Sequence, residues 1–65
     1  MTTIYYNKET LKQIIKNIDV NMPNDIFKFV YGEICKDFEE IGSCNNIILI
    51  QNIIMLAGIQ GYEIK

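Results

Sequence analysis

The sequence contains no histidine, no arginine and no tryptophan, and only two cysteines among 65 residues. Without histidine, Cys35 and Cys44 cannot complete a four-ligand zinc site. Neither thiol has the neighbouring base that a thiolate nucleophile needs. The four glycines are scattered, so they form no phosphate-binding loop. We therefore expect no enzymatic activity, no catalytic residue, no bound metal and no cofactor.

Positive charge is also scarce, with a formal net charge of −2. Arginine makes the commonest specific base contact, and nucleic-acid-binding proteins usually carry a basic surface, so the composition does not favour a nucleic-acid partner. One alternative stays open. A short strand followed by two helices is the element order of a ribbon-helix-helix DNA-binding regulator. Thr3 and Tyr5 would then face the DNA, although the strand carries no arginine or lysine.

The first ten residues, MTTIYYNKET, have no apolar core behind a basic head, as a secretory signal would. We expect a cytoplasmic protein with free thiols. A chain of this length buries only about 60% of its unfolded surface and often needs a disulfide, a metal or a second subunit. Because we expect neither a disulfide nor a bound metal, we expect an oligomer, most simply a homodimer.

The apolar spacing predicts a single, mainly α-helical domain. Leu11, Ile14, Ile15 and Ile18 follow the one-face helical pattern, and Pro23 separates this helix from the next. We expect three short helices at about 8–19, 24–41 and 45–60, with optional short terminal strands at 3–6 and 62–64, assembled as a homodimeric bundle. The expected boundary residues are Asn7, Asn24 or Asp25, Gly42, and Ser43 or Asn45.

The third segment is unusually apolar from Ile47 to Ile59, interrupted by Gln51 and Asn52. Its first half, 46–51, also suits a buried strand, but the length of the run favours a helix. It is too short to span a bilayer, which takes about 20 apolar residues, and no basic cluster flanks it, so we expect no membrane association. A helix that is apolar nearly all round must be covered nearly all round, and two short neighbouring helices can cover only about half of it.

A second copy of the chain is the simplest cover for this helix. Gln51 or Asn52 near the two-fold axis would set the register, as a buried Asn does in coiled coils. The predicted dimer-interface residues are Ile47, Ile50, Ile53, Ile54 and Leu56.

Carboxylates gather near the end of the second predicted helix, where the helix dipole disfavours negative charge. We interpret this acidic patch as a surface for a basic protein partner. Its members are Glu33, Asp37, Glu39 and Glu40. On the first predicted helix, Lys8, Lys12 and Lys16 form a basic row, which we interpret as a solvated surface.

These observations predict a small non-enzymatic protein-interaction module, a homodimer that binds and inhibits or regulates a protein partner. The many Ile, Asn and Lys residues are typical of an AT-rich coding genome, which suggests a phage or another mobile element. Two alternatives remain: a ribbon-helix-helix-like DNA-binding regulator, and a protein that sequesters a small ligand at the dimer interface.

Overall fold

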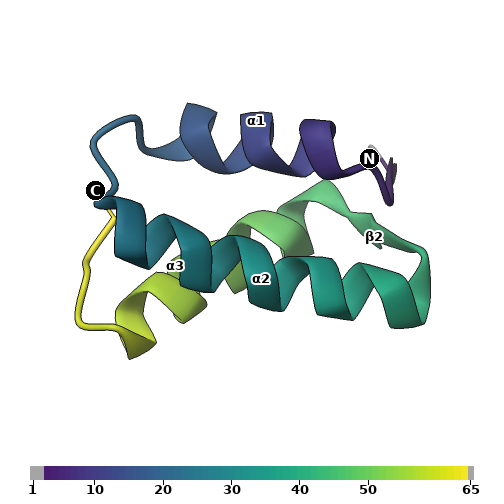
Figure 1. Ribbon diagram of the computed structural model, residues 1–65. Coiled ribbons are helices and arrows are strands. Elements are labelled where there is room, and N and C mark those ends of the chain that lie inside the picture. The colour runs from purple at the N-terminus through teal and green to yellow at the C-terminus, as the bar shows by residue number, and fades with distance from the viewer. Residues whose placement is uncertain (1–2, 65) are drawn as a thin grey trace.

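The computed structural model describes residues 3–64 and is mainly helical. The elements follow one another as β1 (Thr3–Tyr5), α1 (Lys8–Ile18), α2 (Asn24–Ile41), β2 (Ser43–Asn45) and α3 (Asn46–Ile59). Successive helices reverse direction, so that α2 runs back beside α1 and α3 runs back beside α2 (Figure 1). The three predicted helices are confirmed, with boundaries no more than a residue from those expected.

Local chemistry explains most of the helix ends. The Asn7 side chain accepts a hydrogen bond from the Thr10 amide at 3.0 Å, and the Asn45 side chain accepts one from the Ile47 amide at 2.8 Å. Each supplies a partner to an amide that the first turn of a helix leaves unpaired. Gly42 ends α2 in the left-handed region, with φ 88, a conformation that favours glycine.

The start of α2 differs from the prediction. Asn24 and Asp25 lie inside the first turn of the helix, and Pro23 occupies the capping position without a side-chain hydrogen bond. The expected cap by Asn24 or Asp25 is therefore wrong. Pro23 has φ −57, close to a helical value, so the ring directs the chain into the first turn without a polar cap.

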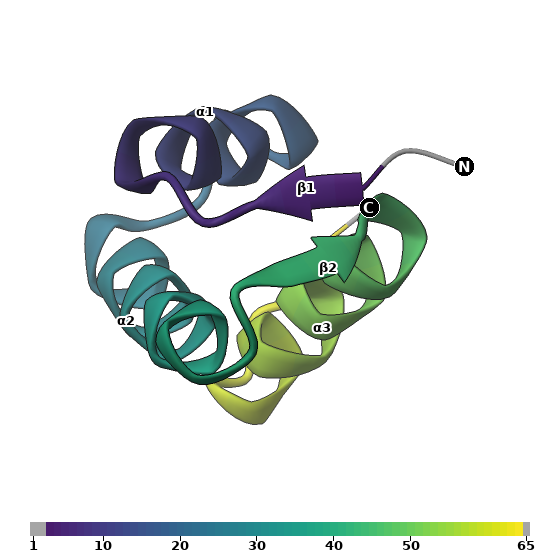
Figure 2. The ribbon, with the colours of Figure 1, turned by 90° about the vertical axis from the view of Figure 1, so that its right-hand side faces the viewer.

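The two strands form a small antiparallel ribbon. The strand expected at 3–6 is confirmed as β1, whereas β2 was not predicted. Thr3 pairs with Asn45, Ile4 with Cys44 and Tyr5 with Ser43. The ribbon lies between α1 and α3 at one end of the molecule (Figure 2). The expected strand at 62–64 is wrong, because those residues have no strand conformation and β1 pairs instead with the residues that follow Gly42.

The core is wholly apolar within residues 3–64, where no polar or charged residue is buried. It draws on all three helices and consists of Leu11, Ile15, Ile26, Val30, Ile34, Phe38, Leu49, Ile53 and Ala57. The contribution of α3 is a single line of residues spaced four apart, Leu49, Ile53 and Ala57. Because α3 is apolar on every side, the rest of its apolar surface faces outwards.

Candidate interaction surface

The outward half of α3 presents an almost continuous apolar surface to solvent. We call it the α3 face, and it comprises Ile47, Ile48, Gln51, Ile54, Met55, Gly58 and Ile59. Ile47 and Ile48 are each 51% exposed, Met55 is 56% exposed and Ile59 is 65% exposed. Gln51 is the sole polar side chain in the set, and α3 carries no charged residue. Large apolar patches of this kind on small domains usually mark a site of protein contact.

Depressions border the α3 face on both sides. Towards α2, Ile41 and Ile48 line a recess of about 100 Å³. Towards α1, Ile50 shares a groove of about 260 Å³ with Ile14 and Ile18. Ile41 is itself 71% exposed, so the apolar surface extends beyond α3 onto the end of α2.

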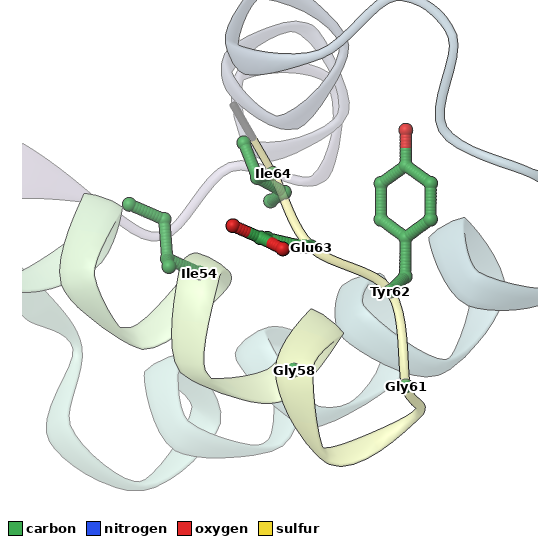
Figure 3. A pocket seen from close by; sticks show the side chains of 6 residues that line it. All are labelled: Ile54, Gly58, Gly61, Tyr62, Glu63 and Ile64. Carbon is green, nitrogen blue, oxygen red and sulfur yellow. The ribbon is translucent and has the colours of Figure 1, made fainter.

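The C-terminal end of the α3 face is hollowed. Gly58 has no side chain, and a Cβ placed there would meet nothing within 4 Å. Ile54 and the residues after α3 complete the walls of an open depression of about 290 Å³, which we call the Gly58 notch. Figure 3 shows the tail passing Gly58, with the Glu63 carboxylate between the side chains of Ile54 and Ile64.

The residues predicted to form a dimer interface differ in how far they are exposed. Ile47, Ile50 and Ile54 are exposed, and Leu56 is half-buried. Ile53 is fully buried in the core of its own chain, at 0% exposure, and therefore belongs to the fold of the single subunit. Of the two central amides, Gln51 lies on the α3 face and Asn52 is half-buried at the recess beside α2.

Some members of the α3 face were missed, namely Ile48, Met55, Gly58 and Ile59. No pattern in the sequence indicated them, because a helix that is apolar at nearly every position does not reveal which side turns inwards. The packing of α3 against α2 and the ribbon decides this.

The predicted acidic patch lies on the second half of α2. Glu33, Asp37 and Glu40, spaced four and three residues apart, share one side of the helix. Lys36 partly offsets the charge, with its Nζ 3.6 Å from Glu33 Oε2. Glu39 faces elsewhere and accepts a hydrogen bond from the Tyr6 hydroxyl at 3.3 Å. The structure thus groups three of the four predicted carboxylates and gives Glu39 a contact of its own.

Two lysines of the basic row lie over aromatic rings of α2. Lys12 Nζ is 5.7 Å from the centre of the Tyr31 ring, and Lys16 Nζ is 5.7 Å from the centre of the Phe27 ring. The two rings stack, with centres 5.8 Å apart and planes 4° from parallel. Contacts of this kind contribute about 0.5–1 kcal/mol each at exposed sites. These lysines therefore help to pack α1 on α2, a role that the sequence did not indicate.

The hydroxyls of Tyr6 and Tyr62 donate hydrogen bonds to carboxylates. The hydrogen bond to Asp19, followed by burial, raises the pKa of Tyr62. Burial, followed by the nearby Glu39 carboxylate, raises the pKa of Tyr6. Burial and the adjacent Cys35 likewise raise the pKa of Tyr31. Each shift keeps the phenol protonated, which suits a hydrogen-bond donor and not a nucleophile.

Within residues 3–64, no group of three or more His, Cys, Asp or Glu side chains could hold a metal ion. None of the helices in that range combines the length and apolarity needed to cross a membrane. Cys35 and Cys44 are both half-buried free thiols. Comparison of the chain with protein families, curated proteins and solved structures found no match. The α3 face and the acidic side of α2 are therefore the features on which a function can be argued.

Proposed function

We propose that the protein is a small non-enzymatic interaction module that forms a homodimer and binds another protein to inhibit or regulate it. The observation that carries this proposal is the exposed apolar α3 face on a chain of 65 residues. The core uses only the inward line of α3, so the fold itself does not require the outward line to be apolar. Exposed apolar side chains lower solubility, and a protein contact explains their presence on this surface.

The acidic side of α2 supports a second contact, with a basic surface on a different protein. Glu33, Asp37 and Glu40 belong to α2, beside the α3 face and not within it. A dimer formed through α3 would leave Glu33 and Glu40 available to the partner, whereas Asp37 lines the recess next to Ile48. Opposite charge across such a contact speeds encounter and improves selectivity, and its effect weakens with salt.

The pairing of β1 bears on the alternative of a DNA-binding regulator. In the ribbon-helix-helix arrangement, the strands of two copies pair and enter the major groove. Here β1 pairs with β2 of the same chain, and its outward residues, Thr3 and Tyr5, carry no positive charge. This arrangement does not favour DNA as the partner.

Affinity purification from the native host tests the proposed function. We expect the wild type to retain one specific protein, and the variant Glu33→Lys/Asp37→Lys/Glu40→Lys to retain about tenfold less of it, because each exposed charge contributes modestly and the three act together. A control, Glu9→Lys/Asp25→Lys, changes exposed carboxylates elsewhere and should retain the partner normally. Equal retention by the patch variant would remove the acidic contact. A strictly monomeric wild type that retains no specific protein would overturn the proposal as a whole.

A further inference from the structure

We infer that the α3 face is covered by the α3 face of a second copy, in antiparallel orientation, with Ile47 of each copy inserted into the Gly58 notch of the other. This inference rests on the proposed function and deepens it by naming the surface and the orientation of the homodimer. The observations that carry it are the spacing, the sizes and the charge of the residues on the α3 face.

The spacing of the central line is the same in both directions. Ile47, Gln51, Ile54 and Gly58 are separated by four, three and four residues, so all lie on one line along the exposed side of α3. A two-fold axis that relates antiparallel helices pairs each residue with its counterpart from the other end, and this symmetric spacing allows all four residues to be paired. Ile47 then faces Gly58 of the partner, and Gln51 faces Ile54 of the partner.

The sizes of the paired residues favour the antiparallel orientation over a parallel one. In the antiparallel pair, the half-exposed side chain of Ile47 meets the empty space at Gly58, and this happens twice. A parallel pair would place Ile47 against Ile47 and Gly58 against Gly58, which combines crowding at one end with a void at the other. Well-packed interfaces avoid both defects. The opposed helix dipoles of the antiparallel pair also attract.

Charge and area suit a second copy of the chain. Each copy has a net charge of −2, yet α3 itself has no charged residue. Glu63 lines the Gly58 notch, and an antiparallel pair places the two notches at opposite ends of the contact, so like charges do not meet face to face. The helix has 14 residues and is therefore about 21 Å long. Its outward half presents roughly 450 Å² of accessible surface, and the flanking Ile41 and Ile50 bring the total for two copies to about 1,000–1,200 Å². This is the lower limit for a specific interface, so we expect a dimer of micromolar affinity.

Sedimentation equilibrium from about 5 to about 500 micromolar measures the association. We expect the wild type to pass from monomer to dimer over this range. Gln51→Glu and Ile54→Lys each place a charge against an apolar surface, so each should weaken self-association at least about tenfold. Both residues are exposed in the single chain. Their circular dichroism spectra should therefore match that of the wild type.

An equimolar mixture of the two variants distinguishes the orientations. In the antiparallel pair, Glu at position 51 of one chain faces Lys at position 54 of the other, and the second crossing keeps the wild-type contact between Gln51 and Ile54. The heterodimer should therefore recover affinity to within about threefold of the wild type. In a parallel pair, position 51 faces position 51 and position 54 faces position 54. Mixing would then relieve only the repulsion between like charges and leave each charge without a partner, so recovery should stop well short of the wild-type affinity.

A size exchange tests the notch. Gly58→Leu fills it and should weaken the dimer at least about tenfold, since the side chain of Ile47 no longer fits. Adding Ile47→Ala to the same chain moves the large residue to the other side of the contact and should recover most of the loss. Absence of this recovery would overturn the pairing of Ile47 with Gly58.

The outcomes separate this inference from the proposed function. A wild-type dimer that Gln51→Glu disrupts, without recovery in the mixture, would overturn the antiparallel register and leave the homodimeric module standing. A dimer unaffected by Gln51→Glu would place self-association on another surface and overturn the inference. A wild type that stays monomeric to about 500 micromolar would overturn it too, while partner retention through the acidic side of α2 is decided by the purification experiment.

Discussion

At the scale of single residues, tyrosine–carboxylate contacts join segments that are far apart in the chain. The Tyr62 hydroxyl donates to Asp19 Oδ2 at 2.6 Å and links the tail after α3 to the turn after α1. The Tyr6 hydroxyl donates to Glu39 and links the start of the chain to the end of α2. The sequence did not predict these pairs, because they depend on how the helices return beside one another.

The Tyr62 contact predicts a specific pH dependence. Its pKa is raised in the folded protein, so the native chain keeps this proton at a pH where the unfolded chain has lost it. The contribution is therefore complete below about pH 10 and is lost as the pH rises through the folded pKa. Urea unfolding between about pH 8 and about pH 11 should show stability falling more steeply in the wild type than in Tyr62→Phe.

Tyr5→Phe is the control for this measurement, because Tyr5 is 72% exposed. This variant should follow the wild type throughout the pH range. Tyr62→Phe should also have a lower urea midpoint near pH 7, where the hydrogen bond is intact in the wild type. Equal slopes for the wild type and Tyr62→Phe above pH 10 would show that the bond to Asp19 does not contribute to folding.

At the scale of elements, the glycine inside α2 and the glycine that ends it should respond in opposite ways to alanine. Gly32 lies inside the helix, where a Cβ meets nothing within 4 Å, so Gly32→Ala should stabilise the protein by about 0.5–1 kcal/mol. Gly42 has φ 88, so Gly42→Ala should destabilise it by about 1–2 kcal/mol despite equal space. Urea unfolding of both variants measures the two changes in the free energy of unfolding. Changes of the same sign at the two positions would contradict this account.

The inward line of α3 gives a second prediction at this scale. Ile53→Ala leaves a cavity in the core and should cost about 2–5 kcal/mol, whereas Ile47→Ala on the α3 face should change the stability of the monomer by less than about 0.5 kcal/mol. Both substitutions are best compared in a Gln51→Glu background, which removes any contribution from self-association. Similar losses at the two positions would mean that α3 is turned differently on its axis.

These elements also show where sequence reasoning succeeds. Helix boundaries follow from nearby residues: Asn7 and Asn45 cap, Pro23 interrupts and Gly42 supplies a left-handed turn. The ribbon was missed because Ser43–Asn45 is only three residues long and pairs with a strand at the other end of the chain. The position of the ribbon depends on long-range packing. The same packing determines that Ile53 is buried in the core and that Ile54 is exposed.

At the scale of the whole molecule, the three helices are covered unequally. Lysine side chains of α1 extend over the aromatic rings of α2, and the core fills the contact between α2 and α3. The ribbon lies at one end of the helices, and the tail held by Tyr62 lies at the opposite end, next to the turn after α1 (Figure 1). The outward half of α3 is left uncovered, with Ile47, Met55 and Ile59 each more than half exposed. The inward side of α3 is therefore covered by its own chain, and the outward side, where we place the second copy, is exposed.

Self-association through this open side should make thermal stability depend on protein concentration. When a dimer unfolds to two separate chains, a higher protein concentration favours the folded dimer. Each tenfold increase in concentration stabilises it by about 1.4 kcal/mol per dimer, or about 0.7 kcal/mol per chain. For a chain of 65 residues, this corresponds to a rise in Tm of roughly 5 °C per tenfold step once the dimer predominates. Calorimetry of the wild type should show this rise, and the Tm of Gln51→Glu should rise much less, because its weakened dimer is scarcely populated over most of the concentration range. A wild-type Tm that does not change between about 20 and about 500 micromolar would mean that the α3 face stays open in solution, and the case for the second copy would fail with it.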